Sequence, residues 1–467
     1  MSLYRSPTTA NAIPDAAAKP RIYFDCTATW RVGGNTGIQR VVRNLIHHCQ
    51  ATAEQLGIEC RPVVHVHGVW RLVSPRLPDD SPAPPKSAWR RRLQMVRDGA
   101  VWLRGRLRKA LVPKRIYVPL QRWYCYWEPA MGNPRVRFQP DDILLLPDVG
   151  WCREAPWPLE YVRQAGASVG LVSYDLIPIR YPEHQVAGFA ETFENWLQET
   201  LDHVDFVVAI SQAVRDDLES YLAEMGPRRS RLRGRVGWFP LGVSLDQAHP
   251  DAPVRAALRD VFAPAAGPPP LLLVCTLEPR KNHALLLDAF DQLRADHPDL
   301  RLCLVGRAGW CCDELVERIT SHPDYQQRLF WFSDLNDTEL RFAYQHAQTF
   351  VFPSFAEGFG LPIIEALRFG LRVFASDIPA HREVGGEHCR YFDPGNSSSL
   401  VELLRETLRA QAAGSLARSE AVVVTDWETS ALRLWTECLR LGATRFAHES
   451  FPRQQSPSGE ESRRQAA

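Results

Sequence analysis

The stretch AEGFGLPIIE, residues 356–365, places the carboxylates of Glu357 and Glu365 eight residues apart, with a glycine-bracketed turn between them. The apolar run at 350–352, just before it, is typical of a buried strand. Pro362 suits the first turn of a helix because its missing N–H would have no partner there, and Gly370 can end that helix. The stretch therefore predicts a strand, a loop that carries Glu357 and a helix that carries Glu365.

The turn between the two glutamates predicts a binding site for an anion joined to a polyol. Free N–H groups from Gly358 to Leu361 would point into one space, and a helix N-terminus favours an anionic ligand. Carboxylates accept hydrogen bonds from hydroxyl groups. For Glu365 alone, an ordinary first-turn acid stabilised by the helix dipole is the alternative interpretation.

Further apolar runs on both sides of this stretch are typical of buried parallel strands. Between them lie segments with helical spacing, such as residues 38–49, and strand–helix alternation over such a length predicts an α/β fold. The runs predicted as strands are residues 21–26, 143–146, 169–174, 206–210, 271–275, 302–305, 350–352 and 373–375.

The length of 467 residues predicts two domains, since a single hydrophobic core stops growing at a smaller size. A strand-like run ends at 239–243, and a polar, Pro- and Ala-rich stretch follows it. We expect two doubly wound, Rossmann-like domains that face each other across a cleft. The predicted ranges are a disordered tail at 1–20, an N-terminal domain at 21–243, a C-terminal domain at 244–426, a helix at 427–447 that returns to the N-terminal domain, and a disordered tail at 448–467.

Composition narrows the class of protein. The formal net charge of +1 argues against binding to nucleic acid through the whole surface. The eleven cysteines are scattered and odd in number, without a CxxC pair, which predicts reduced core thiols in a cytoplasmic protein. No signal peptide and no apolar run of spanning length is evident in the sequence.

Two adjacent cations, Arg280 and Lys281, follow the predicted strand at 271–275. In open α/β sheets, ligands bind beyond the carboxyl ends of the strands, so both side chains would project into the cleft. Such a pair suits a diphosphate, because arginine binds its oxygens in a bidentate fork while lysine acts as a point charge. Taken alone, an Arg-Lys pair is typical of a solvated surface.

Four successive motifs stand out in the C-terminal half: TLEPRKN at 276–282, VGRAGW at 305–310, VFPSFAEGFGLPIIEAL at 351–367 and SDIPAHREVGG at 376–386. They resemble the motifs of the retaining glycosyltransferases of family 4, glycosyl transferases group 1, which have the GT-B fold. The N-terminal half adds GNTGIQRVVRNL at 34–45, YDLIPIRYPE at 174–183, ISQAVRDDL at 210–218 and FPLGV at 239–243. These segments are similar to those of bacterial mannosyl- or rhamnosyltransferases that build O-antigens and exopolysaccharides.

The resemblance implies roles for individual residues. Arg280 and Lys281 would hold the diphosphate of a nucleotide sugar, and Glu365 would bind the ribose hydroxyls. Glu357 would engage the donor sugar. The other residues that the resemblance implies are Gly358, Phe359, Gly360, Leu361 and Gly306 on the donor side, and Asp175 as a further catalytic residue.

In the N-terminal half, the loop at 33–37 leads into a helix that carries Arg40. A glycine-rich loop lets the backbone approach a phosphate or an acceptor closely, although packing alone also explains such glycines. We therefore name Gly37, Arg40 and Tyr174 as candidate acceptor or phosphate residues. Tyr174 stands where family members often carry histidine, and it cannot reproduce the proton chemistry of imidazole near neutral pH.

The predicted function is transfer of a hexose from a nucleotide-diphosphate sugar to a growing, lipid-linked bacterial polysaccharide. GDP-mannose is the first candidate donor, and a dTDP- or UDP-sugar is the next. The family scheme is same-face substitution, in which the leaving phosphate helps to take the acceptor proton. Since no Asp-x-Asp triplet occurs, no metal and no cofactor are expected.

Three alternatives stay open beside this function. A glycoside hydrolase would use Glu357 and Glu365 across one bond, but it gives no reason for the Arg-Lys loop. A catalytically silent subunit would bind the nucleotide sugar without turnover, as the tyrosine at 174 suggests. A sugar-nucleotide epimerase would act on the same donor and consume no acceptor.

Residues 86–115 form a basic amphipathic segment. It holds eleven lysine and arginine residues against one acid, Asp98, and apolar residues recur every three or four positions. That pattern fits an interfacial helix on an anionic membrane, although a solvated helix packed on the first domain is the alternative. We therefore expect a peripheral protein on the cytoplasmic face of the inner membrane.

Overall fold

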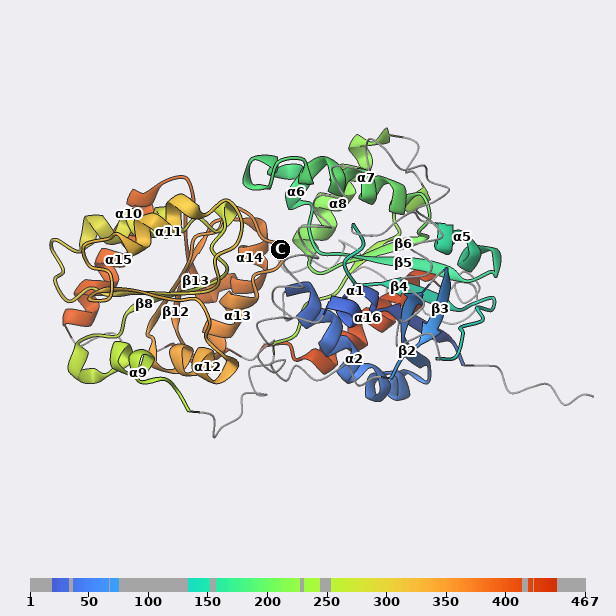
Figure 1. Cartoon of the computed structure of the whole chain (residues 1–467), viewed down its shortest axis with the longest axis horizontal. Coiled ribbons are helices and arrows are strands. Elements are labelled where there is room, and N and C mark those ends of the chain that lie inside the picture. The colour runs from blue at the N-terminus through green and yellow to red at the C-terminus, as the bar shows by residue number, and fades with distance from the viewer. Residues whose placement is uncertain are drawn as a thin grey trace, which may run out of the picture.

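The computed structural model describes residues 19–32, 37–66, 68–74, 133–151, 157–226, 231–243, 253–413, 419–422 and 424–442. These residues form two α/β domains, each built on one sheet with helices on both sides (Figure 1). The basic segment at 86–115, the loop at 33–36 and most of both predicted tails lie outside the described residues. The membrane prediction made from 86–115 therefore stays a prediction.

The N-terminal domain contains a seven-stranded sheet in the order β3-β2-β1-β4-β5-β6-β7. All neighbours are parallel except the antiparallel pair β2 and β3, and Ile22 of β1 lies between Cys60 and Ile143 in the register. The strands are β1 Arg21–Asp25, β2 Glu59–Val66, β3 Val69–Leu72, β4 Ile143–Leu146, β5 Ser168–Ser173, β6 Phe206–Ala209 and β7 Val236–Trp238.

Hydrophobic cores cover both faces of this sheet. Along β4, Ile143 and Leu145 pack into the core on one face, while Leu144 and Leu146 pack into the core on the other. Because successive side chains of a strand alternate between faces, burial on both sides requires an unbroken apolar run. The covering helices are α1 Thr27–Val32, α2 Gly37–Leu56, α5 Trp157–Gln164, α6 Ile177–Arg180, α7 Phe189–Leu201 and α8 Gln212–Glu224.

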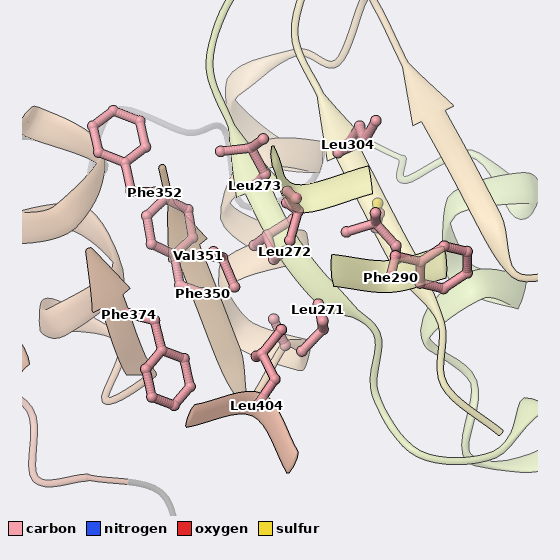
Figure 2. Packing of buried hydrophobic residues seen from close by; sticks show 14 of the residues in the cluster. Leu271, Leu272, Leu273, Phe290, Leu304, Phe350, Val351, Phe352, Phe374 and Leu404 are labelled. Atoms are coloured by element: carbon pink, nitrogen blue, oxygen red, sulfur yellow. The ribbon is translucent and has the colours of Figure 1, made fainter. Parts of the chain in front are cut away.

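The C-terminal domain contains a six-stranded sheet whose neighbouring strands are all parallel, in the order β10-β9-β8-β11-β12-β13. Figure 2 shows its core, where Leu272 of β8 and Phe350 of β11 lie between Phe290 and Phe374. The strands are β8 Leu271–Val274, β9 Leu302–Val305, β10 Leu329–Phe332, β11 Thr349–Phe352, β12 Arg372–Ser376 and β13 Cys389–Phe392.

Helices follow the strands of the second domain in regular alternation. The short 3-10 helix η6 Pro279–Lys281 comes directly after β8 and leads into α10. The α-helices are α9 Ala256–Phe262, α10 His283–Leu293, α11 Asp313–Thr320, α12 Asp337–His346, α13 Leu361–Arg368, α14 Pro379–Gly385 and α15 Ser397–Ala412.

The last described helix, α16 Trp427–Gly442, lies in the N-terminal domain among the blue elements of Figure 1. It packs against α2, and its Trp435 is fully buried, with the indole N–H donating to Thr52 Oγ1 at 2.9 Å. The chain therefore crosses between the domains twice, once after β7 and once before α16.

The domains also touch through polar contacts at the start of α8. Ser211 caps this helix and donates to the carbonyl of Gly358 at 2.7 Å. Glu383 of α14 accepts from the backbone N–H groups of Gln212 and Ala213, each at 2.8 Å. A carboxylate at a helix N-terminus satisfies otherwise unpaired donors and interacts favourably with the helix dipole.

Two predictions made from the sequence need correction. Cys311 is exposed, so the described cysteines, which are all free thiols, are not all core residues. The strand predicted at 169–174 ends at Ser173, which leaves Tyr174 in the following loop. Within the described ranges, no helix is both long and apolar enough to cross a membrane.

Candidate functional site

Both sheets reverse their strand order once, and polar side chains gather at each reversal. In the C-terminal sheet the reversal lies between β8 and β11, which are neighbours with connections running in opposite directions. The loop after β8 carries Arg280 and Lys281, and the loop after β11 carries Glu357. A crevice at such a switch point is where open α/β sheets bind ligands.

Glu357 holds both cations in the structure. Its Oε1 forms an ion pair with Lys281 Nζ, and its Oε2 lies 2.9 Å from Arg280 Nη1. Arg280 also donates to the Ala356 carbonyl at 2.9 Å and pairs with Glu278 at 2.8 Å. The structure thus brings together three of the predicted catalytic residues, and it adds Glu278, which the sequence did not single out.

The charges in this cluster control its protonation. Burial alone would raise the pKa of Glu357, but Arg280 and Lys281 outweigh burial and hold this pKa well below its usual range. Burial raises the pKa of Glu278 and of Asp175, against the opposing effect of Arg280. Glu357 is therefore ionised at neutral pH and cannot supply a proton.

The turn after Glu357 matches the predicted geometry. Helix α13 starts at Leu361 with Pro362 in its first turn, and Gly360 adopts a left-handed conformation with φ 109°. Among the described residues, no partner accepts a hydrogen bond from the amides of Gly358, Phe359 or Gly360. The side chain of Phe359 packs into the hydrophobic core of the N-terminal domain, so this turn also joins the two domains.

At two of the predicted donor positions, a backbone carbonyl of another segment lies so close that only glycine fits. A Cβ on Gly358 would lie 2.2 Å from the Tyr174 carbonyl oxygen of the other domain. A Cβ on Gly306 would lie 1.8 Å from the carbonyl oxygen of Cys275, and the residue has φ 149°. Packing explains both glycines without a ligand, so their donor role stays a prediction.

Glu365 lies on α13 and is almost fully buried. Its carboxylate accepts from the Tyr344 hydroxyl at 2.9 Å, and its Oε1 lies 3.2 Å from Arg40 Nη2 of α2. Arg40, predicted to bind the acceptor or a phosphate, thus contacts the residue predicted to bind ribose. Gly37 is the exposed first residue of α2.

The N-terminal sheet reverses between β1 and β4 and places a second polar group opposite the first. Asp148, just after β4, accepts from the backbone N–H of Thr29 at 2.7 Å and from that of Val149 at 2.8 Å. Asp175 follows β5 and accepts from the backbone N–H of Ile177 at 3.0 Å. Asp175 interacts electrostatically with Arg280 and Glu357, so it faces the cation cluster from the other domain.

Tyr174 does not present a free hydroxyl proton to a ligand. Its hydroxyl donates to the Pro147 carbonyl at 2.6 Å, and burial raises its pKa well above the ordinary value. Tyr174 thereby ties β5 to the loop after β4. A proton-transfer role is excluded for this side chain near neutral pH.

A cavity of about 380 Å³ lies between this polar group and the cation cluster. Asp148, Asp175 and Arg280 contribute to its lining, and most of the remaining wall is apolar or aromatic. The cavity thus begins at the predicted catalytic cluster and extends into the N-terminal domain.

Comparison with known proteins identifies a family match in the C-terminal domain. Residues 254–419 match the family described as glycosyl transferases group 1. The matched range is less than half of the chain. All six strands of the second sheet, together with Arg280, Lys281, Glu357 and Glu365, fall inside the matched range of this glycosyl transferases group 1 domain.

Curated relatives extend the similarity beyond this domain. Serotype-specific mannosyltransferase WbdA of Escherichia coli is 32% identical over 302 residues, which are 63% of this chain and 37% of the relative. O-antigen chain mannosyltransferase B of Escherichia coli is 30% identical over 249 residues, which are 50% of this chain and 60% of the relative. The chain thus spans less than two thirds of the length of either relative.

Solved structures confirm the predicted GT-B fold. Sucrose-phosphate synthase from Thermosynechococcus elongatus superposes with a TM-score of 0.56 at 18% identity, covering 91% of this chain and 99% of that one. HepE from Anabaena, solved in complex with UDP and glucose, gives a TM-score of 0.52 at 16% identity, with coverage of 90% and 99%. At these low identities, both structures show a similar fold and nothing more.

Besides Glu278, sequence reasoning missed a second side chain of the candidate site, His381 of α14. It is fully buried and lies close enough to Glu357 and Lys281 to interact with both charges. Its Nδ1 lies 3.0 Å from the Ser376 carbonyl, which can only accept, so Nδ1 carries the proton. The motif SDIPAHREVGG contained His381, but its position beside the cluster follows only from the fold.

No group of three or more His, Cys, Asp or Glu residues arranged to hold a metal ion occurs in the part of the chain that the structure describes. The expectation of a reaction without metal stays a prediction.

Proposed function

We propose that this protein is a glycosyltransferase that moves a hexose from a nucleotide-diphosphate sugar to a growing polysaccharide. The observation that carries the proposal is the cluster of Arg280, Lys281 and Glu357 at the switch point of a glycosyl transferases group 1 domain. The similarity to mannosyltransferases of Escherichia coli supports mannose as the sugar, and GDP-mannose is the first donor to test.

Each predicted donor residue has a matching chemical role. Arg280 and Lys281 supply two positive charges for the diphosphate, and the unpaired amides of the turn at 358–360 supply donors to its oxygens or to sugar hydroxyls. Glu365 would accept from the ribose hydroxyls in place of Arg40. Because these groups come from rigid strand ends and one helix start, they are positioned before the donor arrives.

The proposed step is a substitution at the anomeric carbon. The acceptor oxygen forms a bond to this carbon while the bond from the carbon to the diphosphate oxygen breaks. The hydroxyl proton passes to the leaving diphosphate, and the products are a glycoside and a nucleoside diphosphate. Arg280 and Lys281 stabilise the negative charge that develops on the leaving group, which is a large contribution in a partly buried site.

The structure disfavours one of the alternatives. A glycoside hydrolase needs a carboxylic acid that is protonated near neutral pH. The two cations keep Glu357 ionised, so it cannot be that acid. The carboxylate of Glu365, the other candidate acid, is paired with Arg40 and accepts from the Tyr344 hydroxyl. A silent binding subunit and an epimerase use the same donor chemistry, and product analysis separates them from a transferase.

The experiment combines donor binding with product analysis. Calorimetry with GDP, UDP, dTDP and ADP identifies the base, and mass spectrometry then follows transfer from the matching sugar nucleotide to a panel of glycosides. We expect a glycoside product with release of nucleoside diphosphate. Arg280→Ala should lower transfer by a factor of about a hundred or more, since removal of one charge-stabilising donor typically costs about 3–4 kcal/mol of transition-state stabilisation.

Arg390→Ala is the matched control. Arg390 lies in the same domain, and its ion pair with Glu406 is exposed on both sides. This variant should transfer at the wild-type rate. Binding of a donor without turnover toward every acceptor would support the silent subunit, and an altered sugar nucleotide without acceptor use would support the epimerase.

A further inference from the structure

The aromatic part of the cavity has no assigned occupant. Trp151, Phe189, Phe193 and Trp196 line it from the N-terminal domain, and Trp310 lines it from the C-terminal domain. The volume of the whole cavity, about 380 Å³, falls within the usual range of small-molecule pockets. The cavity therefore has room for a ligand portion that is distinct from the nucleotide.

The aromatic wall is rigid. The ring of Trp151 lies 5.5 Å from that of Phe193 and 5.6 Å from that of Trp196, with tilted and edge-on geometry. Trp196 also packs closely over Gly150, where a Cβ would approach its ring within 2.5 Å. Such interlocked rings keep their orientation, so they present fixed faces and edges to the cavity.

Trp310 closes the wall from the other domain. Its indole N–H donates to the His184 carbonyl at 3.1 Å, while 36% of the residue remains exposed. The aromatic lining is therefore complete only when both domains are in contact.

The end of the cavity nearest the cation cluster is polar. One carboxylate oxygen of Asp175 accepts from Ile177 N, and no described residue donates to the other oxygen. Arg280 lines the same end of the cavity. A hydroxyl group placed there could donate to Asp175 and at the same time lie next to the leaving group held by Arg280.

We propose that this cavity binds one sugar ring of the acceptor, with the hydroxyl to be glycosylated at Asp175 and the ring against the aromatic wall. The proposal rests on the proposed function and names the acceptor class of the same site. A saccharide is amphipathic, so its C–H face suits the aromatic rings and its hydroxyls suit the carboxylate. A prenyl chain would leave the Asp175 carboxylate desolvated without a donor, which is costly.

The test separates acceptor binding from donor binding. Trp310→Ala and Phe189→Ala each remove part of the aromatic wall, and both residues are partly exposed, so the fold should survive. We expect KM for methyl glycoside acceptors to rise about tenfold in each variant, with a smaller change in kcat and an unchanged Kd for the donor nucleotide. Tyr161→Ala is the control, because Tyr161 is an exposed aromatic residue on α5 that does not line the cavity.

Two kinds of result would overturn this inference. One is an unchanged KM for the methyl glycosides in both variants. The other is a KM change confined to geranyl glycosides, which would assign the cavity to the lipid part of the acceptor.

If the proposed function is wrong, the assays give results that differ from those that would overturn the sugar subsite. If the wild type binds nucleotide but transfers to no acceptor, calorimetric binding of methyl glycosides to the wild type and both variants still tests the cavity. Binding that is weakened by both substitutions supports the sugar subsite in the absence of turnover. A lack of binding to the wild type refutes the subsite.

Discussion

At the scale of single residues, the site places three carboxyl groups around two cations before a ligand binds. Glu278, Glu357 and Asp175 surround Arg280 and Lys281, and ion pairs join the two cations to Glu278 and Glu357. A diphosphate must therefore compete with Glu357 for both cations. We infer that Glu357 weakens binding of the product diphosphate and so favours its release.

This competition predicts the behaviour of Glu357→Gln. Removal of one negative charge beside the cations should tighten binding of inorganic pyrophosphate about tenfold or more, since unit charges a few ångströms apart near a protein surface interact by about 4 kcal/mol. Without ligand, the variant should be less stable by roughly 3–5 kcal/mol, because Lys281 loses its ion pair with a carboxylate and Arg280 keeps only its ion pair with Glu278. Calorimetry with pyrophosphate and thermal unfolding measure the two effects.

Glu339→Gln provides the comparison for this prediction. Glu339 is also a buried carboxylate of the C-terminal domain, and it pairs with Arg255, which is not part of the cluster. Its substitution should destabilise the domain without a change in pyrophosphate affinity. Weaker pyrophosphate binding to Glu357→Gln than to the wild type would contradict the competition.

At the level of residues, the sequence predicted proximity where a motif places the residues, while their roles stay predictions. Arg280, Lys281 and Glu357 were named because each follows a recognisable strand, and the fold brings them into contact. The pair of Arg40 and Glu365, separated by 325 positions, could not be found in this way. A contact of that kind depends on how two domains meet, which local patterns do not encode.

At the scale of elements, the strands that the sequence predicted are those buried on both faces. Residues 143–146 and 302–305 were predicted with the bounds that the structure gives them, because unbroken apolar runs mark such strands. The hairpin of β2 and β3 was missed, since Arg61, Pro62 and His65 interrupt its apolar pattern. The sheet-edge strand β13 was missed for the same reason, as it carries the exposed Arg390.

The loop before α13 predicts a specific effect of Gly358→Ala. The new Cβ would meet the backbone carbonyl of Tyr174, which cannot rotate away as a side chain can. The two domains must then separate locally, which pulls Asp175 away from the cation cluster. We expect transfer to fall at least tenfold while the C-terminal domain still unfolds at nearly its normal temperature.

Small-angle scattering and a transfer assay measure this effect, with Gly395→Ala as the control. A Cβ on Gly395 would meet only the movable side chain of Asp393, at 3.3 Å. Normal transfer by Gly358→Ala would show that the contact between Gly358 and Tyr174 is dispensable.

At the scale of the whole molecule, the candidate site takes side chains from both domains. The cation cluster and Trp310 come from the C-terminal domain, while Asp175 and most of the aromatic wall come from the N-terminal domain. The helix α16 and the contact of Glu383 with α8 hold this arrangement. Stability of the C-terminal domain is therefore a condition for the site, and two buried histidines make this stability depend on pH.

His381 and His283 are both buried in the C-terminal domain, and burial lowers their pKa to about 4 and to about 3. In the unfolded chain each would bind a proton near the ordinary value of about 6.5. The unfolded state therefore binds more protons as the pH falls below this value, and folding stability decreases. For His381 the loss should be about 3 kcal/mol between roughly pH 6.5 and pH 4, at about 1.4 kcal/mol per pKa unit.

Urea unfolding of wild type and His381→Asn between neutral pH and pH 4 measures this dependence. Asparagine keeps a donor near the Ser376 carbonyl but does not titrate, so the variant should lose less stability on acidification than the wild type. Substitution of the exposed His388 of the same domain by asparagine should leave the pH dependence unchanged. Equal acid sensitivity of His381→Asn and wild type would mean that His381 does not contribute, and the loss over this pH range would then be assigned to His283.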